Sequence, residues 1–543
     1  MIRIIGAVCV LLALAPDVQG QEQEVELADG SRAWSTPGEQ RGWFAPSTPA
    51  DVGEYLAGLA GKFDVVTLDT LSWIDGGSVE PDSALPVLLA RIRRPSEATG
   101  QRLRVLVLAG QRGDDLSGTE VSLQIIRELV LGEIGALLDD LEIAFIPAAN
   151  PWGLLWWTAA EPSGVDQALD HTLLRSPATR GVHDLVADWR PHLVVELREI
   201  GPMVYRVQAG LARHPNVDPD LIRYGRFYLL PHVANELSRA SVTFREYVAV
   251  GPDSATFETP LMGAAALPDG AFLTPGQLGA EHAGNAFSLG GSLSIMLGVT
   301  SMGGVDGLVE RVQLLYQSVG YLLEVAAAQA EGLLEFDESP PPALSLRHDH
   351  VLNEQQPELV WMVWNERGQI VQQTTDRWRS VVRRKLALPI PAAWVIEPAG
   401  REWAELVAAH GFRVERLSRG ESLKVGSYRI GAIAALPPDL GNELPLESAP
   451  DGTNLLVHGE RDFPEGAWIV RADQPGIRLL FTLIEPWSLD APLGREAGAG
   501  KDGPENPSTL EMYPVHRIGV VEPLESLRTE PADFGAAQAG PAD

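Results

Sequence analysis

Short apolar segments alternate with longer amphipathic segments between residues 45 and 335, and this alternation restricts the architectures that the chain can adopt. Four of the short segments have the length of buried strands: FDVVTLDTL, RLRVLVLAG, LEIAFIPAANP and PHLVVELRE. The segment GTEVSLQIIRELVLGEIGALL has helical spacing, and apolar residues recur on one helix face from Val305 to about Leu333. Because strands that alternate with helices form parallel sheets, we expect an α/β fold with a mixed, largely parallel sheet flanked by helices over residues 45–335.

Changes in composition divide the rest of the chain. EFDESPPPALS contains three consecutive prolines and predicts a linker over residues 336–345. Beyond it, AAWVIEPAGREWAELVAAHGFRVERL reads as strand, helix and strand, which predicts a smaller α/β C-terminal domain over residues 346–520, with LEMYPVHRIGV as an edge strand. The polar residues 21–44 are expected to form a loose N-terminal segment, and residues 521–543 a disordered tail.

The first 20 residues have the pattern of a secretory signal peptide. Arg3 gives a positive start, an apolar stretch follows, and Val18 and Gly20 are small residues before a cleavage site. An uncleaved anchor is the alternative, but the apolar run is short for a membrane span. We expect cleavage after Gly20, export to the periplasm or the medium, and a mature chain without a transmembrane segment.

Cysteine content and charge exclude several classes of site. Cys9 is the only cysteine and lies in the signal peptide, so the mature chain has no disulfide, thiolate metal site or cysteine nucleophile. The formal net charge is −31, from 42 Lys and Arg against 73 Asp and Glu. This acidic balance argues against a nucleic-acid partner, which requires clustered basic residues.

Four segments bring polar residues together in a fixed order: VLVLAGQRGDDLSGTE, IPAANPWG, SGVDQALDH and WRPHLVVELRE. Their order and spacing resemble the zinc metallocarboxypeptidase (carboxypeptidase A-like) family. In that family a strand runs into His-x-x-Glu, an Asn-Pro-x-Gly turn and Gly-x-Asp-x-Asn-Arg follow, and a later strand ends in the second zinc histidine. PAAWVIEP, AAHGFRVERL and LIEPWSLDAPL also resemble the C-terminal extension of some bacterial members. The resemblance implies a metallocarboxypeptidase-like fold.

The zinc ligands that the resemblance implies are replaced. Two neutral imidazoles and one carboxylate hold Zn²⁺ in such sites and leave one position for water. Arg112 and Arg198 stand at the two histidine positions, and Asp115 stands at the glutamate position. A guanidinium has no lone pair to offer, and one carboxylate does not make a zinc site. We therefore expect no cofactor, and zinc only if the ligands lie elsewhere.

The other catalytic positions of the family are also altered. Ala168 and Leu169 stand where Asn-Arg would clamp the terminal carboxylate of a substrate, and NPWGLLWWTAAEPSGVD contains no arginine for an oxyanion. GGSLSIMLGVTSMGG has no acid, and Gly298 aligns with the missing general base. A general base is worth about 10²–10⁴-fold in rate, and an oxyanion donor about 10²–10³-fold. Their combined loss leaves no peptidase of this mechanism.

These departures predict an exported, non-catalytic pseudoenzyme that binds peptides or anionic ligands, or acts as a scaffold for a partner that the sequence does not identify. Two arginines and one aspartate sum to +1, as do two neutral histidines, one glutamate and Zn²⁺, so a positive site could persist. Strand alternation sends Glu196 to the same face as Arg198 and Glu199 to the other. One alternative is an active zinc metallocarboxypeptidase acting on peptides or cell-wall peptides. Another is hydrolysis by a different mechanism.

Two other features have both a functional and an ordinary interpretation. RHDH at residues 347–350 pairs two histidines as in a metal site, but beside a linker we expect it to be solvated. Trp152, Trp156 and Trp157 could line a groove for a peptide or sugar, although a loop packed on the domain is the favoured interpretation.

Overall fold

The computed structural model describes residues 34–77, 83–95, 101–201, 204–251, 271–301, 304–364, 369–429, 456–491, 512–519, 524 and 527–534. The predicted signal peptide, residues 1–20, lies outside these residues. Within the described part of the chain, no helix is long and apolar enough to cross a membrane.

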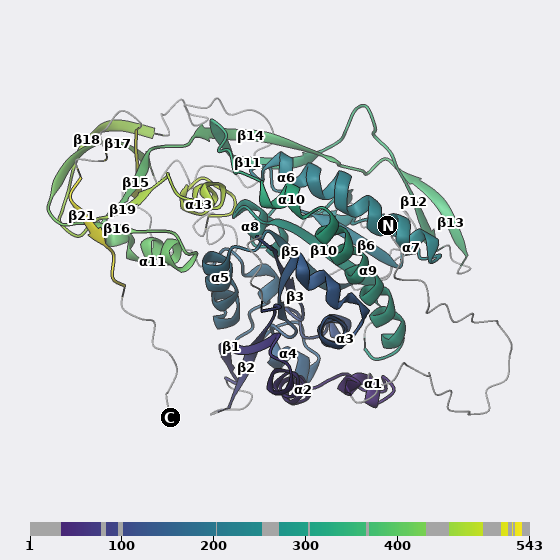
Figure 1. Ribbon diagram of the computed structural model, residues 1–543. Coiled ribbons are helices and arrows are strands. Elements are labelled where there is room, and N and C mark those ends of the chain that lie inside the picture. The colour runs from purple at the N-terminus through teal and green to yellow at the C-terminus, as the bar shows by residue number, and fades with distance from the viewer. Residues whose placement is uncertain are drawn as a thin grey trace, which may run out of the picture.

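An eight-stranded mixed sheet forms the centre of the larger region (Figure 1). In spatial order its strands are β1 (Val66–Asp75), β2 (Ala84–Ile92), β4 (Leu141–Ile146), β3 (Leu103–Leu108), β5 (Leu193–Ile200), β10 (Leu293–Thr300), β6 (Val207–Leu211) and β7 (Phe244–Glu246). The four central strands β4, β3, β5 and β10 run parallel, whereas β1 pairs antiparallel with β2, β2 with β4, and β6 with β10. The predicted mixed, largely parallel sheet is confirmed.

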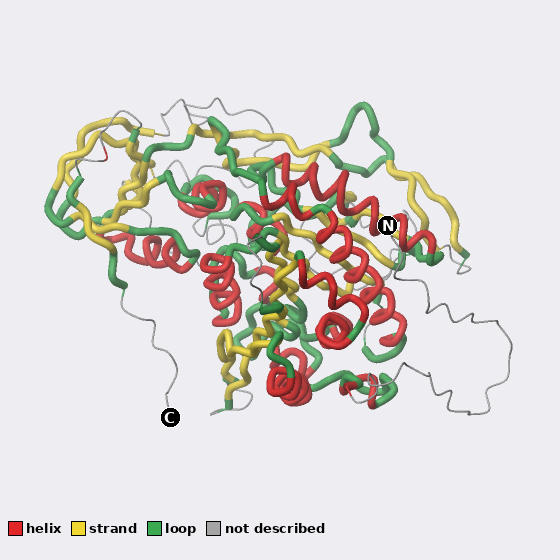
Figure 2. Tube along the Cα trace, viewed as in Figure 1, coloured by secondary structure: helices red, strands yellow, loops and turns green. Residues whose placement is uncertain are grey.

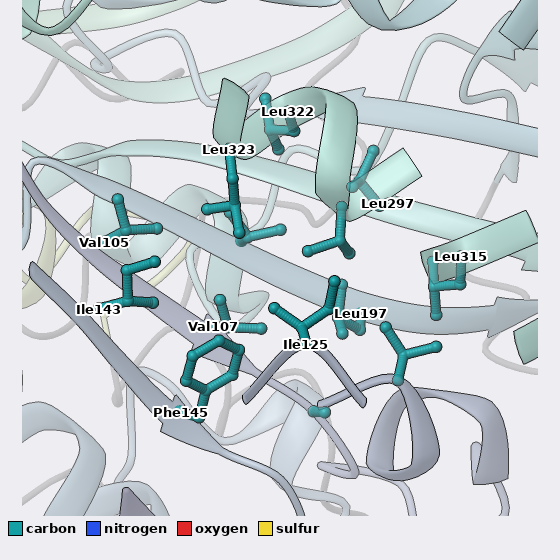
Figure 3. Close-up of a cluster of buried hydrophobic side chains, with 14 of the residues drawn as sticks. Val105, Val107, Ile125, Ile143, Phe145, Leu197, Leu297, Leu315, Leu322 and Leu323 are labelled. Atoms are coloured by element: carbon teal, nitrogen blue, oxygen red, sulfur yellow. The ribbon is translucent and has the colours of Figure 1, made fainter. Parts of the chain in front are cut away.

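Helices cover both faces of this sheet. The helical segments of the region are α1 (Pro37–Gln40), α2 (Pro49–Lys62), α3 (Leu116–Leu131), η2 (Glu133–Asp139), α4 (Pro151–Trp156), η3 (Gln167–Leu169), α5 (Pro177–Trp189), α6 (Pro219–Tyr224), η4 (Gly225–Leu229), α7 (Leu230–Arg239), α8 (Ala283–Leu289), α9 (Leu308–Ala328) and α10 (Ala330–Leu334). Successive strand residues face opposite sides, so Val105 and Val107 pack with α3 and α9 (Figure 3), whereas Leu106 and Leu108 pack with α5 and α8.

Local sequence sets the starts of the helices that follow β4 and precede β5. Asn150 caps α4 by accepting a hydrogen bond from the Gly153 N–H, and Pro151 occupies the first turn. Ser176 caps α5 through the N–H groups of Ala178 and Thr179, and proline again begins the helix. Short polar side chains satisfy the free N–H groups of a first turn, and proline has no N–H there to lose.

A second region contains a seven-stranded antiparallel sheet, seen at the left of Figures 1 and 2. Its order is β18 (Leu456–Phe463), β17 (Glu421–Arg429), β20 (Met512–Ile518), β15 (Ala393–Ile396), β19 (Trp468–Arg471), β16 (Glu415–Leu417) and β21 (Thr529–Pro531). The helical segments are η6 (Pro398–Gly400), α11 (Arg401–Ala409) and α13 (Ile477–Ile484). Two-stranded sheets pair β11 (Ala343–Val351) with β14 (Val381–Pro389), β12 (Leu359–Trp364) with β13 (Ile370–Thr375), and β8 (Ala249–Gly251) with β9 (Phe272–Thr274).

The two regions share one apolar core and one buried polar junction. The core combines Ala280 and Leu289 of the first region with Trp394, Phe481 and Trp487 of the second. In the junction, the loop after β6 contacts the second region. The side-chain amide of Asn216 donates to Ser345 O and accepts from Ser345 N, and Arg478 donates to Asp218 Oδ2 at 2.7 Å. The second region is therefore packed against the first rather than tethered to it.

Several boundary predictions need correction. Strand β11 begins at Ala343, inside the predicted linker. Helix α1 lies in the segment 21–44 that was expected to be loose, because Thr36 and Glu39 form a capping box. Strand β21 lies in the predicted disordered tail, since it pairs with β16. Strand β20 is central rather than an edge strand, because it pairs with both β15 and β17.

Candidate functional site

The segment from Gln111 to Asp115 connects the carboxyl end of β3 to α3 and carries the first candidate residues. Its backbone is fixed against the next loop, since Asn150 N donates to Gly110 O at 2.8 Å. A Cβ on Gly113 would lie 1.8 Å from the carbonyl carbon of Gly153 in α4. This close approach requires glycine, and it holds the loop and α4 together.

Arg198 links the two acidic side chains that lie nearest to it. Near the end of β5, its Nε donates to Asp115 Oδ2 and its Nη1 to Glu196 Oε1, each at 3.0 Å, although Asp115 is 83 positions earlier. The Arg198 side chain is 22% exposed, and the two carboxylate side chains are 7% exposed. The carboxylate of Asp115, at the predicted zinc-ligand position, is therefore paired with the guanidinium of Arg198.

Burial and the ion pairs shift the pKa values of this group in opposite directions. Burial raises the pKa of Asp115 to about 7, against the lowering effect of Arg198. Burial lowers the pKa of Arg198, but Glu196 and Asp115 more than offset this effect and raise it above its ordinary value. Arg198 thus stays charged, and Asp115 is the group that titrates near neutral pH.

Arg112 lies beside this network and faces other acids. Its Nε is 3.4 Å from Asp114 Oδ1, and its Nη1 is 3.4 Å from Asp166 Oδ2. Asp115 N donates to the backbone O of Arg112 at 3.1 Å, but the Arg112 guanidinium has no described hydrogen bond to the Asp115 carboxylate. Two guanidinium groups therefore face up to four carboxylates, the fourth belonging to Glu196. The predicted net positive site is wrong, because Asp114, Asp166 and Glu196 were absent from the charge sum.

The remaining sequence-predicted positions lie close to this group. Gly298 of β10 is the direct partner of Arg198 in the parallel pairing with β5. A Cβ on Gly298 would lie 3.0 Å from side-chain atoms of both Ile200 and Met296, so a longer side chain would require these two to move aside. Ala168 and Leu169 lie in η3, which Asp166 caps through the N–H of Ala168. Ala168 is buried and offers no side-chain donor to a carboxylate.

A buried chain of hydrogen bonds continues from Glu196 into the domain, and sequence reasoning missed it. Gln111 Nε2 donates to Glu196 Oε1 at 2.9 Å, and His171 Nε2 lies 2.6 Å from Gln111 Oε1. His171 Nδ1 lies 3.1 Å from His183 Nε2. Burial lowers the pKa of His171 to about 3, so the ring is neutral. The only sequence signal was that His171 ends the motif SGVDQALDH, since its partner Gln111 is 60 positions away.

Glu199 lies on the opposite face of β5, as strand alternation predicts. Its Oε1 accepts a hydrogen bond from Ser117 N at 2.9 Å and lies 3.1 Å from Arg311 Nε in α9. It fixes the start of α3 and does not join the Arg198 network through any described hydrogen bond.

The described residues also include a buried group that could hold a metal ion: His214, His348 and Asp490. One donor atom from each lies within 4.8 Å of the others. RHDH was expected to be solvated, but His348 is buried, because β11 lies at the junction between the two regions. The predicted absence of a cofactor is therefore not supported by the structure.

The hydrogen bonds of His214 show whether the described arrangement of His214, His348 and Asp490 could bind a cation. The Asn216 N–H donates to His214 Nδ1 at 3.1 Å, so the ring proton is on Nε2, which lies 3.1 Å from Asp490 Oδ2. A histidine that binds a metal through one nitrogen normally donates an N–H from the other, and His214 accepts there instead. Asp490 also interacts with the buried Arg347, which supplies a positive charge. This arrangement does not fit a metal unless His214 changes its partners.

The fold and the site define a mixed α/β protein whose polar site lies at the carboxyl ends of its central parallel strands. No protein-family model matches the chain. The chain is 21% identical to Carboxypeptidase 2 of Trichophyton tonsurans over 459 residues, which cover 79% of this chain and 78% of that protein. It is 20% identical to Carboxypeptidase 2 of Trichophyton rubrum over 452 residues, with 77% of each chain covered.

Among solved structures, the chain is similar to a metallo-carboxypeptidase from Pseudomonas aeruginosa, with 18% identity, a TM-score of 0.39, and coverage of 54% of this chain and 71% of that one. It is also similar to the carboxypeptidase A from Helicoverpa armigera, with 13% identity, a TM-score of 0.39, and coverage of 53% and 75%. The curated relatives support the metallocarboxypeptidase-like family, and the resemblance predicted from the order of the motifs is confirmed.

Proposed function

We propose that this chain is a carboxypeptidase-like pseudoenzyme that binds peptides at the site around Arg112, Asp115 and Arg198 without cleaving them. The observation that supports this function best is the pair of 3.0 Å hydrogen bonds from Arg198 to Asp115 and Glu196. A divalent cation at Asp115 would have to displace a charged guanidinium from a largely buried carboxylate. Breaking a buried ion pair costs about 3–5 kcal/mol, before repulsion between the cation and Arg198 is counted.

The lost catalytic groups support the same proposal. Gly298 provides no general base, and a side chain there would require Ile200 and Met296 to move aside. Ala168 and Leu169 provide no donor for the terminal carboxylate of a peptide. Binding without cleavage is the function that remains when a fold keeps its surface loops and loses the reacting groups.

An active zinc carboxypeptidase is the second candidate, and two observations favour it. The curated relatives carry the name Carboxypeptidase 2, and His214, His348 and Asp490 lie close enough to hold a metal if His214 exchanges its hydrogen-bond partners. All three side chains are buried, whereas a catalytic zinc needs an open position for water and substrate. A metal there would be structural, so this candidate is the weaker one.

Metal content and peptidase activity test the proposal together. We expect the native chain, dialysed against zinc and then against buffer, to retain far less than one zinc per chain and to release no C-terminal residue from peptides. The triple variant Arg112→His, Asp115→Glu, Arg198→His should gain zinc, since it restores two imidazoles and a longer carboxylate. Zinc-dependent release of C-terminal residues by the native chain would contradict the proposal.

Two further variants locate any zinc that the native chain does hold. Zinc that is lost from His348→Ala but kept in Asp115→Ala lies in the buried His214 group. Zinc with the opposite pattern lies at the Arg198 site, where Asp115 is the ligand-capable group, and would contradict the pseudoenzyme proposal.

We further propose that the protein is exported and that residues 1–20 are removed on the way. The basic start, apolar stretch and small residues before Gln21 support this step. N-terminal sequencing of protein from its native host should find Gln21 first, and a mature chain that begins at Met1 would contradict it.

A further inference from the structure

Three consecutive large apolar side chains are exposed at the end of α4, next to the loop that carries Arg112. Trp156 is 55% exposed and Trp157 is 48% exposed, and Leu155 precedes them on the surface. Trp152, one turn earlier, is fully buried and donates from Nε1 to Ile74 O at 2.7 Å. The expected packing of the tryptophans on the domain therefore holds for Trp152 only, and the other two face solvent.

The backbone around these tryptophans is fixed rather than loose. Trp157 adopts a left-handed conformation with φ of 54°, which is uncommon for a residue with a Cβ. Its N–H donates to Gly153 O, as does the N–H of Thr158, and Gly153 is the residue that touches Gly113. The exposed tryptophans are thus held next to the Arg112 loop by backbone contacts on both sides of Gly153.

The loop that carries Arg112 contacts α4 at Gly153, and the charged groups at this loop are mainly acidic. Asp114 is 41% exposed, and it shares the single guanidinium of Arg112 with Asp166 at 3.4 Å. Two carboxylates with one partly exposed arginine leave an excess of negative charge. The whole chain has a formal net charge of −31, which adds to the attraction of cations.

We infer that the surface formed by Trp156, Trp157 and Asp114 binds a basic peptide segment, with lysine or arginine side chains lying over the indole rings and next to the carboxylates. The inference rests on the proposed peptide-binding function and narrows its ligand class. Cations bind to the faces of tryptophan rings, and a nearby carboxylate orients the same charged group. An anionic peptide meets the same carboxylates with the wrong sign.

Calorimetric titration with four matched pentapeptides tests this ligand class. Three of the peptides have blocked ends and differ only in their three central residues. These residues are lysine and arginine in the basic peptide, glutamine in the neutral peptide, and glutamate in the acidic peptide. The fourth is the glutamine peptide with a free C-terminus. We expect measurable binding of the basic peptide, weaker binding of the neutral ones, no effect of the free C-terminus, and a lower affinity at higher salt because the attraction is screened.

Three variants locate the binding surface. Trp157→Ala should weaken binding of the basic peptide about two- to fivefold, the size of one exposed cation–π contact. The double variant Trp156→Ala, Trp157→Ala should weaken binding of the basic peptide further. The single variant Asp114→Asn should reduce the salt dependence of this binding. Phe227→Ala is the matched control, because Phe227 is an exposed aromatic residue in η4 and should not matter. Circular dichroism melting curves confirm that each variant folds.

The outcomes separate this inference from the proposed function. Tighter binding of the acidic peptide, or binding of the basic peptide that the tryptophan and Asp114 variants leave unchanged, would overturn the inference and leave peptide binding intact. Binding of none of the peptides would overturn both. Zinc-dependent cleavage would contradict the pseudoenzyme proposal. Even then, loss of basic-peptide binding in the variants would support the inference that this surface binds the basic peptide.

Discussion

Replacement of Arg198 by methionine is the most direct test of the ion-pair network at the candidate site. Arg198→Met keeps an unbranched side chain but removes both hydrogen bonds, which leaves Asp115 and Glu196 without their shared cation. Loss of one partner of a buried pair costs about 3–5 kcal/mol. Because the Arg198 side chain is 22% exposed, we expect the lower end of this range, about 3 kcal/mol of unfolding free energy at pH 8.

The same variant should be less harmful at lower pH. The pKa of Asp115 is about 7 in the native chain, above its value in an unfolded chain. The contribution of such an acid to the free energy of unfolding is fully present below its pKa in the unfolded chain. This contribution is lost as pH rises through its pKa in the folded chain. At pH 5, Asp115 is protonated and interacts little with Arg198, so the loss in Arg198→Met should be smaller than at pH 8 by about 1 kcal/mol or more.

Urea unfolding of the native chain and two variants at pH 5 and pH 8 measures these differences. Arg112→Met is the matched control, since Arg112 is partly exposed and its carboxylate contacts are 3.4 Å long; it should cost less than about 1 kcal/mol. Equal losses in the two variants, or a loss in Arg198→Met that does not grow with pH, would refute this account of the network.

Three other substitutions have outcomes that the structure determines. Burial raises the pKa of Glu120 to about 7, so native stability should fall as pH rises through 7, and Glu120→Gln should reduce the change in Tm between pH 5 and 8; an unaltered pH dependence would count against it. Gly113→Ala places a Cβ 1.8 Å from a backbone carbon of Gly153 and should cost more than about 2 kcal/mol in urea unfolding. The control Gly61→Ala meets nothing within 4 Å in its helix and should be neutral or stabilising by up to about 1 kcal/mol. Arg478→Met removes a buried cation of the junction between the two regions and should cost about 3 kcal/mol or more, with faster limited proteolysis; unchanged proteolysis would contradict the role of the junction.

Sequence periodicity predicted a largely parallel central sheet because its buried strands and the helices between them have local patterns; the order of the strands was not predicted. Buried parallel strands such as β3, β4 and β5 are continuous apolar runs, and the helices between them have helical spacing. The motif order also placed Asp115 and Arg198 in one site, since both follow or end strands whose carboxyl ends lie at the same edge. Their hydrogen bond agrees with that placement.

Long-range pairing was not accessible from the sequence. The segment containing β20 follows a stretch rich in Gly, Ala, Pro and Glu. Nothing in it indicates that two distant strands, β15 and β17, pair with both edges of β20. Only part of the wrong charge sum has the same cause: Asp166 is 54 positions from Arg112. Asp114 and Glu196 each lie two positions from the arginine that they contact, and they were left out of the sum. His214 and Asp490 are 276 positions apart, so their contact also depends on the tertiary fold.

Under the proposed pseudoenzyme function, the crowded surface at Gly298 affects how readily a general base could arise at this position. A methyl group there would already be 3.0 Å from Ile200 and Met296, so a glutamate would need both neighbours to shift or to become smaller. A glutamate at position 298 alone would overpack the surface, and a smaller neighbour alone would leave a cavity, so each change alone lowers stability. Neither change would assist catalysis until Arg198 is also replaced. Under that proposal, a gain of peptidase chemistry would have to pass through several destabilised intermediate sequences, whereas changes of ligand preference at the proposed tryptophan surface could each be made singly.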